Sequence, residues 1–95
     1  MKPFVLHKSS NKKKKYDVWI PRGERLKKVS FGAAGYSDYT IHKDKDRRER
    51  YRARHKKDKL KDPYSAGFWS MFVLWNKTSL KESFKDAVKK AKRLI

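Results

Sequence analysis

Hydrophobic and polar positions alternate in the N-terminal third of the chain, which is typical of β-strands. Tyr16, Val18 and Ile20 alternate with Asp17 and Trp19, and this period of two predicts a half-buried strand. One face of that strand is expected to pack on a core and the other to face solvent.

Two shorter runs complete a predicted antiparallel meander. Phe4–Leu6 predicts the first strand, and the spacing of apolar residues in Leu26–Phe31 predicts the third. Pro21 and Gly23 are expected to end the middle strand, because proline has no N–H to donate to a sheet. Gly32–Gly35 is expected to stop the sheet.

The middle of the chain predicts a helix from about Lys45 to Lys57. Asp44 is a suitable N-cap, and Asp46 and Arg50 are spaced four apart, as in a helical ion pair. Tyr51 is the main apolar anchor of this otherwise polar segment. The helix is expected to end at Asp62-Pro63, since a residue before proline disfavours the α conformation.

Two more helices are predicted in the last third. Phe68–Trp75 is apolar nearly all round, so it is expected to be buried on several sides. Ser79 and Glu82 match a capping box, and a stripe of apolar residues at helical spacing follows. The members of that stripe are Leu80, Phe84, Ala87, Val88, Ala91 and Ile95.

These elements predict an α+β fold, with a small N-terminal antiparallel β-meander followed by about three α-helices. The 95 residues fit a single basic domain, β-rich over 1–35, with an Arg-rich helix in 36–62 and the aromatic and amphipathic helices in 63–95. The predicted core comprises Trp69, Phe72, Trp75, Leu80, Phe84 and Val88 against Val18 and Ile20.

The strong excess of positive charge is the feature that says most about function. There are 28 Lys and Arg residues against 10 Asp and Glu, a net charge of +18. The excess is spread over the three segments as +8, +5 and +5. Such a chain repels itself in the compact state, and an acidic partner relieves that repulsion. Phosphate, acidic protein surface and anionic lipid all qualify. No apolar run approaches the roughly 20 residues of a membrane span. A peripheral role on anionic lipid would use the C-terminal helix, but that helix is more simply explained as a core helix with a solvated lysine face, so a membrane partner is the least expected.

Two segments are candidates for binding that partner. The run from Lys12 to Lys15 is interpreted as a phosphate-binding hairpin tip, a nuclear localisation signal or simply a solvated loop. Residues 47–54 hold five arginines, a choice that favours bidentate bonds to phosphate or carboxylate. The predicted binding residues are Lys12, Lys13, Lys14, Lys15, Arg47, Arg48, Arg50, Arg52, Arg54, Lys56 and Lys57.

A competing interpretation keeps the arginines inside the protein. Five aspartates lie nearby in the sequence and are possible partners for internal ion pairs. They are Asp38, Asp44, Asp46, Asp58 and Asp62.

The remaining candidates favour structure over chemistry. The aromatic residues are expected to serve a core or a protein interface, because the chain is poor in aliphatics. They are Trp19, Tyr36, Tyr39, Tyr64, Phe68, Trp69, Phe72 and Trp75. His7, His42 and His55 lie in separate segments without metal-motif spacing, and cysteine is absent. We therefore expect no catalytic site, no metal and no cofactor.

Several stretches together resemble short uncharacterised proteins of large double-stranded DNA viruses of eukaryotes, including giant viruses of algae and amoebae. They are Phe31–Asp44, Arg47–His55, Asp62–Ser70 and Leu74–Lys77, and the resemblance spans residues 29–86. It implies a viral origin but brings no established activity and no site residues.

These observations predict a non-enzymatic structural protein of a large DNA virus, a minor capsid or internal virion protein that cements its neighbours through basic residues. The expected partners are acidic surfaces of capsid or other virion proteins. The expected location is the virion, with the host cytoplasm or nucleus during assembly. The alternative is a sequence-nonspecific nucleic-acid-binding protein, genome-packaging or ribosome-like, that contacts DNA or RNA phosphates.

Overall fold

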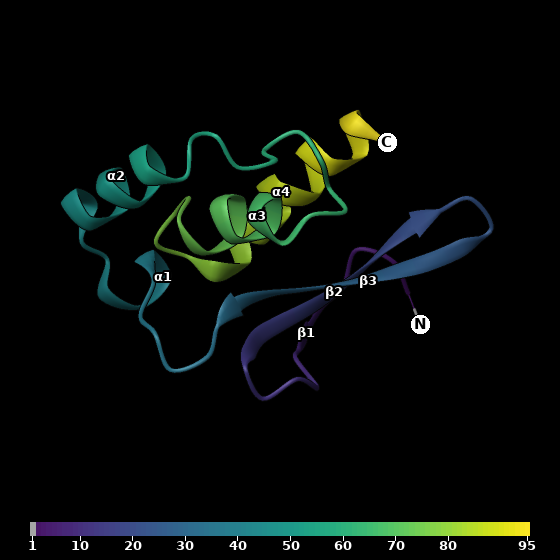
Figure 1. Cartoon of the computed structure of the whole chain (residues 1–95), viewed down its shortest axis with the longest axis horizontal. Helices are drawn as coiled ribbons and strands as arrows, with labels where there is room; N and C mark the ends of the chain where they lie inside the picture. The colour runs from purple at the N-terminus through teal and green to yellow at the C-terminus, as the bar shows by residue number, and fades with distance from the viewer. Residues whose placement is uncertain (1) are drawn as a thin grey trace.

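The computed structural model describes residues 2–95. A three-stranded antiparallel sheet forms one layer, and helices cover one of its faces (Figure 1). The predicted α+β fold is confirmed.

The sheet is built from β1 (Leu6–Lys8), β2 (Lys14–Arg22) and β3 (Arg25–Ala33), in that spatial order. Strands β2 and β3 form the long hairpin of Figure 1, in which Val18 pairs with Val29. Because side chains alternate across a strand, these two valines and their neighbours at spacing two point to the same face, which the helices cover.

Pro21 does not end β2, contrary to the prediction. The strand continues to Arg22, and Pro21 pairs with Leu26 of β3. The partners of β1 are Tyr16–Val18 only, so Pro21 lies where that side of β2 is open, a position that tolerates a missing N–H. Gly23 (φ +62°) then supplies the left-handed turn of the hairpin.

Two short helices follow the sheet. The first, α1 (Tyr39–His42), was not predicted; its N-cap Asp38 accepts a hydrogen bond from the N–H of Thr40. The second, α2 (Lys45–Arg54), begins where predicted, with Asp44 as N-cap.

The end of α2 and one of its expected contacts differ from the prediction. The helix ends at Arg54, with His55 as C-cap, well before Pro63, so the proline is not what stops it. The expected pair of Asp46 and Arg50 is absent from the ion pairs of the described residues.

The aromatic segment forms a helix that changes its winding. An α-helical turn, α3 (Ala66–Trp69), runs into a π-helical turn, η1 (Ser70–Leu74). A π turn places residues five apart on one face, so Trp69 and Leu74 are both buried. The segment is buried on several sides, as predicted.

The last helix, α4 (Leu80–Leu94), is the one that the sequence predicts best. Ser79 caps it and accepts a hydrogen bond from the N–H of Glu82 at 3.2 Å. Its most buried positions are the small residues Ser83, Ala87 and Ala91. Ile95, predicted to belong to the apolar stripe, is 49% exposed because it lies beyond the helix end.

The core is partly the one predicted. Trp69, Val18 and Ile20 are at its centre, together with Val29 and Phe31 of β3. The other predicted members are only partly buried at its edge, because small residues of α4 allow closer packing and take the centre. Those edge residues are Phe72, Trp75, Leu80, Phe84 and Val88.

Candidate functional site

A pocket of about 410 Å³ opens between α2, the end of β3 and the π turn η1. We call it the arginine pocket, because Arg47 and Arg54 of α2 line it. Its other lining residues are Lys15, Gly32, Ala33, Tyr36, Ser37, Asp38, Tyr51, His55, Ser70, Leu74 and Trp75.

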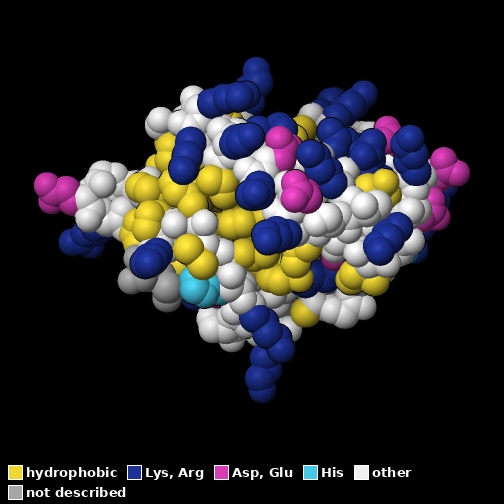
Figure 2. Space-filling model, turned by 180° about the vertical axis from the view of Figure 1, so that it is seen from behind, with side chains coloured by type: hydrophobic (Ala, Val, Ile, Leu, Met, Phe, Trp, Pro, Cys, Tyr) yellow, Lys and Arg dark blue, Asp and Glu magenta, His cyan; other side chains and the backbone are white. Residues whose placement is uncertain are grey.

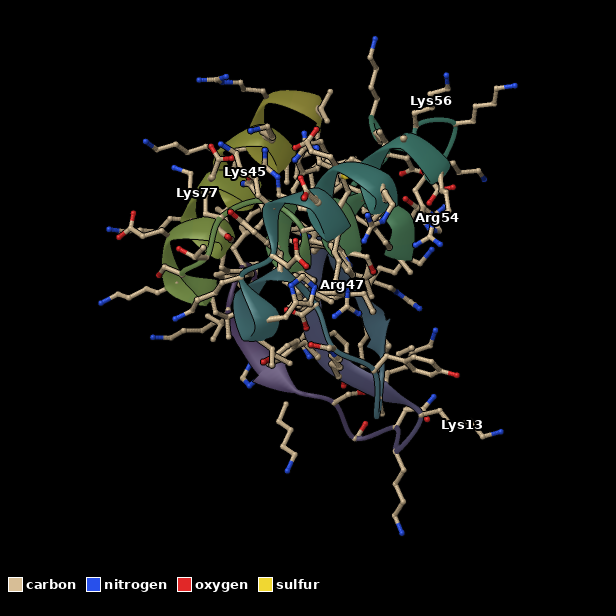
Figure 3. All side chains as sticks on the ribbon, turned by 90° about the vertical axis from the view of Figure 1, so that its left-hand side faces the viewer. Lys13, Lys45, Arg47, Arg54, Lys56 and Lys77 are labelled. Carbon is tan, nitrogen blue, oxygen red and sulfur yellow. The ribbon has the colours of Figure 1, made fainter. Side chains whose placement is uncertain are left out.

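Helical spacing explains why these two arginines share the pocket. Arg47, Tyr51 and Arg54 follow the i, i+4, i+7 rule, so they lie on one face of α2. Both arginines are exposed, and Figure 3 shows them projecting from α2 between Lys56 above and Lys13 below. Two guanidinium groups therefore face an open concave surface.

Arg48 and Arg52, on the adjacent face of α2, are used inside the protein instead. Arg48 Nη1 donates to the carbonyl of Asn76 at 2.8 Å, and Arg52 Nη1 donates to the carbonyl of Trp75 at 3.2 Å. The Arg48 guanidinium also lies over the ring of Tyr39, 5.2 Å from its centroid. These two arginines fix α2 to the chain that follows η1.

Lys15 is likewise held from within. Its Nζ forms an ion pair with Asp38, which is 2% exposed. The same carboxylate accepts a hydrogen bond from the N–H of Thr40 at 2.9 Å. Lys15 therefore lines the arginine pocket with its charge already compensated.

The other lysines of the run surround the turn between β1 and β2. Lys12 and Lys13 form the turn itself, where the N–H of Lys13 donates to Asn11 Oδ1 at 2.9 Å. Lys8, Lys12 and Lys14 line a second pocket of about 540 Å³, here called the lysine pocket. Both pockets include Lys15 in their walls. Together they form one surface, which we call the basic track.

The structure therefore divides the predicted binding residues into three groups. The basic track brings together Lys12, Lys14, Lys15, Arg47 and Arg54. Arg48 and Arg52 are internal, and the remaining four line neither pocket. Those four, all exposed, are Lys13, Arg50, Lys56 and Lys57.

The competing interpretation holds only in part. Arg48 and Arg52 are held inside the protein, but none of the five aspartates forms an ion pair with an arginine of the described residues. Asp44 caps α2, Asp58 contacts His55 Nδ1 at 2.8 Å, and Asp62 accepts a hydrogen bond from the N–H of Tyr64. Asp38 caps α1 and pairs with Lys15. The two arginines of the pocket, Arg47 and Arg54, are therefore left without an ion-pair partner among the described residues.

Three aromatic residues, Tyr36, Tyr51 and Trp75, line the arginine pocket. The ring of Tyr51 stacks on Trp75, with centroids 4.2 Å apart, and on His55 at the same distance. Burial, together with the charge of Asp58, raises the pKa of Tyr51, so its hydroxyl stays neutral at physiological pH. Tyr36, expected in a core or interface, is 73% exposed.

The helical spacing of Arg47, Tyr51, Arg54 and His55 was available in the sequence as a signal for this face. The participation of Tyr36 was not, because it comes from a separate segment that only the fold brings to the pocket.

Positive charge is not confined to the basic track. Figure 2 shows Lys and Arg side chains distributed over the opposite face of the molecule as well. Within residues 2–95, three or more His, Cys, Asp or Glu side chains do not gather in any metal-binding arrangement. In the same residues, each helix is too short or too polar to cross a membrane.

Comparison with known proteins identifies a family but no function. Neither the curated proteins nor the solved structures contain a match. A family model described as a family of unknown function, DUF5754, matches residues 4–55, which run from the start of the sheet region to the C-cap of α2. The match includes both arginines and all lysines of the basic track and covers more than half of the chain. This chain therefore belongs to the DUF5754 family.

Proposed function

We propose that this protein is a non-enzymatic nucleic-acid-binding protein that contacts phosphates without reading base sequence. The observation that carries the proposal is the concave basic track with two exposed arginines, Arg47 and Arg54. Neither arginine belongs to an ion pair of the described residues, and Asp38, the carboxylate in the same pocket wall, is paired with Lys15. Concave basic grooves that follow a phosphate backbone are typical of such proteins.

The charge balance of the folded chain supports this proposal. Of its 28 Lys and Arg residues, only Lys15, Arg48 and Lys90 lie within 4 Å of an acidic oxygen in the described structure. The other 25 have no carboxylate partner there, and all of these except Arg52, which donates to the carbonyl of Trp75, remain candidates for contact with a partner. Because each neutralised phosphate releases condensed counterions, a polyanion gains affinity from every such contact.

The form of the cations suits phosphate. The guanidinium group is a planar fork that donates two parallel hydrogen bonds to one phosphate, whereas the lysine ammonium acts as a point charge. Arg47 and Arg54 are held by a helix that Arg48 and Arg52 fix in place. The lysines of the turn lie at the other end of the track and supply further contacts along the backbone.

A salt series on the purified full chain tests the proposal. Affinity for a duplex of mixed sequence is measured by fluorescence anisotropy between about 50 and 200 mM salt. Six to ten phosphate contacts would lower the affinity by about 10³- to 10⁵-fold over this range. Two unrelated sequences of equal length should bind alike. Affinity that is weak at low salt, or independent of salt, would contradict the proposal.

A structural role in the virion of a large DNA virus is the second candidate, and one observation favours it. A groove of about 340 Å³ between the α3–η1 segment and α4 has apolar walls that include Phe68 and Phe72. Lys61, Lys90 and Arg93 lie around it. An acidic virion protein with one hydrophobic side chain between carboxylates would fit this groove, and the protein would then cement neighbouring subunits.

Fractionation of virus particles separates the two candidates. After the capsid is opened and the genome is digested with nuclease, a cementing protein stays with the shell, and a genome-bound protein is released. Residence in the virion, and in the host cytoplasm or nucleus during assembly, belongs to this second proposal.

A further inference from the structure

Tyr36 has the most exposed large hydrophobic side chain in the described chain, at 73%. Its backbone is held: it follows Gly35 (φ +85°), and its N–H donates to the carbonyl of Ala33 at 3.3 Å. Tyr36 lines the arginine pocket together with Arg47 and Arg54. A ring in this position gains little hydrophobic free energy from folding, but it would gain some if a ligand covered it.

The other rings of this pocket already have partners. Tyr51 lies between Trp75 and His55. Among residues 2–95, the aromatic pairs and cation–π contacts do not include Tyr36. Its ring is thus available to stack on a ligand that reaches the two arginines.

The chemistry of the pocket distinguishes between kinds of nucleic acid. In a duplex, the faces of the bases are covered by their neighbours, so an exposed ring beside the backbone has nothing to stack on. A single strand offers its base faces, and tyrosine rings stack on them with little dependence on sequence. A volume of about 410 Å³ lies within the range of pockets that hold small ligands.

We infer that the arginine pocket binds an unpaired nucleotide, with its base stacked on Tyr36 and its phosphates on Arg47 and Arg54. The protein then prefers single-stranded nucleic acid over duplex, and the lysines of the turn contact the next phosphates of the strand. This inference rests on the proposed function and adds the class of nucleic acid to it.

Tyr36→Ala and Tyr36→Phe in the full chain test the inference. Binding to a fluorescent 20-nucleotide single strand and to the duplex of the same sequence is measured at one salt concentration. The wild-type protein should bind the single strand more tightly than the duplex. Tyr36→Ala should weaken single-strand binding by about 5- to 150-fold, the range for loss of one base–aromatic stack, and should leave duplex binding unchanged.

Tyr36→Phe keeps the ring and should bind both ligands as the wild type does. Because Tyr36 is exposed, circular dichroism and thermal unfolding should be the same for all three proteins, which makes a loss of affinity attributable to the ring.

Three results would overturn the inference. Tyr36→Ala could bind the single strand as tightly as the wild type, both ligands could lose affinity equally, or the duplex could be the preferred ligand. In each case salt-dependent binding would remain and the proposed function would stand. If neither ligand binds at low salt while a poly-glutamate peptide does, the proposed function fails together with the inference.

Discussion

The rings of Tyr51 and Trp75 stack nearly parallel, with centroids 4.2 Å apart and planes inclined by 5°. This contact joins the middle of α2 to the residue that follows η1. Beside it, Arg52 donates a hydrogen bond to the carbonyl of Trp75. Together they fix the rotation of α2 about its axis, and that rotation decides which arginines reach the pocket.

Trp75→Ala should lower the free energy of unfolding by about 3 kcal/mol. This is the low end of the range for buried tryptophan, because Trp75 is only half buried. Urea unfolding followed by circular dichroism measures the change. Tyr51→Phe keeps the stack and serves as the control, with a loss of at most about 1.5 kcal/mol, the contribution of one hydrogen bond of its hydroxyl. A Trp75→Ala variant as stable as the wild type would show that the stack does not hold α2.

Replacing Arg47 and Arg54 together by Gln should weaken DNA binding without changing stability. Both side chains are exposed and lack acidic partners, so unfolding should change by less than about 0.5 kcal/mol. If each arginine contacts one duplex phosphate, the slope of log K against log salt should become shallower by about 1.8. The salt series described for the wild type measures this directly.

Two further double variants serve as controls for that experiment. Arg25→Gln with Lys27→Gln removes the same charge from exposed positions near the hairpin end of β3, and should change the slope much less. Arg48→Gln with Arg52→Gln removes two bonds to backbone carbonyls and should cost about 2–4 kcal/mol of stability. Equal losses of affinity in the Arg47/Arg54 and Arg25/Lys27 variants would show that binding is not localised to the basic track.

Asp38→Ala should destabilise the protein by about 3–5 kcal/mol, the cost of leaving a partly buried charge without its partner. The substitution removes the ion-pair partner of Lys15 and the cap of α1. Adding Lys15→Met to Asp38→Ala should recover part of the loss, since no unpaired ammonium then remains. Chemical denaturation of the single and double variants measures the interaction free energy between Asp38 and Lys15. Strictly additive losses of stability would contradict the ion pair between Lys15 and Asp38. As a control, Lys13→Gln in the exposed turn should leave stability unchanged.

Asp17 should make stability depend on pH in the acid range. It is 4% exposed. Burial opposes its charge, but hydrogen bonds from the Ser30 and Ser9 hydroxyls and the Ser10 N–H, with the charge of Lys28, outweigh this effect and lower its pKa. A folded-state pKa below the unfolded value of about 3.9 favours folding at higher pH. The stabilisation is therefore complete above about pH 5 and is lost as pH falls through the folded pKa.

Asp17→Asn should then cost about 1–3 kcal/mol at pH 7, because buried donors lose a charged acceptor. The difference from the wild type should shrink as pH falls below about 4. Urea unfolding of both proteins from neutral to acid pH measures it, with Glu24→Gln at the exposed hairpin turn as a control of the same charge change. If the stability difference between the wild type and Asp17→Asn grew as pH fell, the pKa of Asp17 would not be lowered in the folded state.

Gly32→Ala should destabilise the protein by about 2–4 kcal/mol, through a left-handed backbone and overpacking together. Gly32 has φ +79°, and a Cβ there would lie 2.8 Å from Leu74 Cδ1 and 3.1 Å from Lys15 Cβ. Gly23 has φ +62° but open space around it, so Gly23→Ala should cost only about 1–2 kcal/mol. Equal effects in thermal unfolding would show that the close approach of η1 to β3 is not important.

Short-range sequence patterns correctly predicted the elements whose structure depends on residues close together in the chain. The alternation around Val18 placed β2, and the capping box at Ser79 placed the start of α4. The same patterns did not predict where α2 ends or where the aromatic helix changes from α to π winding. The end of α2 and the π turn of η1 depend on packing against distant segments, and no short-range pattern encodes this packing.

The candidate site was predictable as a set of cations but not as an arrangement. The sequence pointed to eleven lysines and arginines with no basis for ranking them. Arg47 and Arg48 are neighbours of the same type, yet one is exposed at the pocket and the other donates to the carbonyl of Asn76. Their difference follows from a rotation of about 100° per residue along the helix, which has no meaning until the position of α2 is known.

The sequence by itself determined the class of the fold and indicated that the partner carries negative charge. Alternation and helical periodicity follow from backbone geometry, and a net charge of +18 follows from composition alone. Only the tertiary structure decided which charges remain available. It brought Tyr36, Arg47 and Arg54 to one pocket and used Asp38 and Asp44 as helix caps. These relations are distances between segments far apart in the chain, and only the packed core fixes such distances.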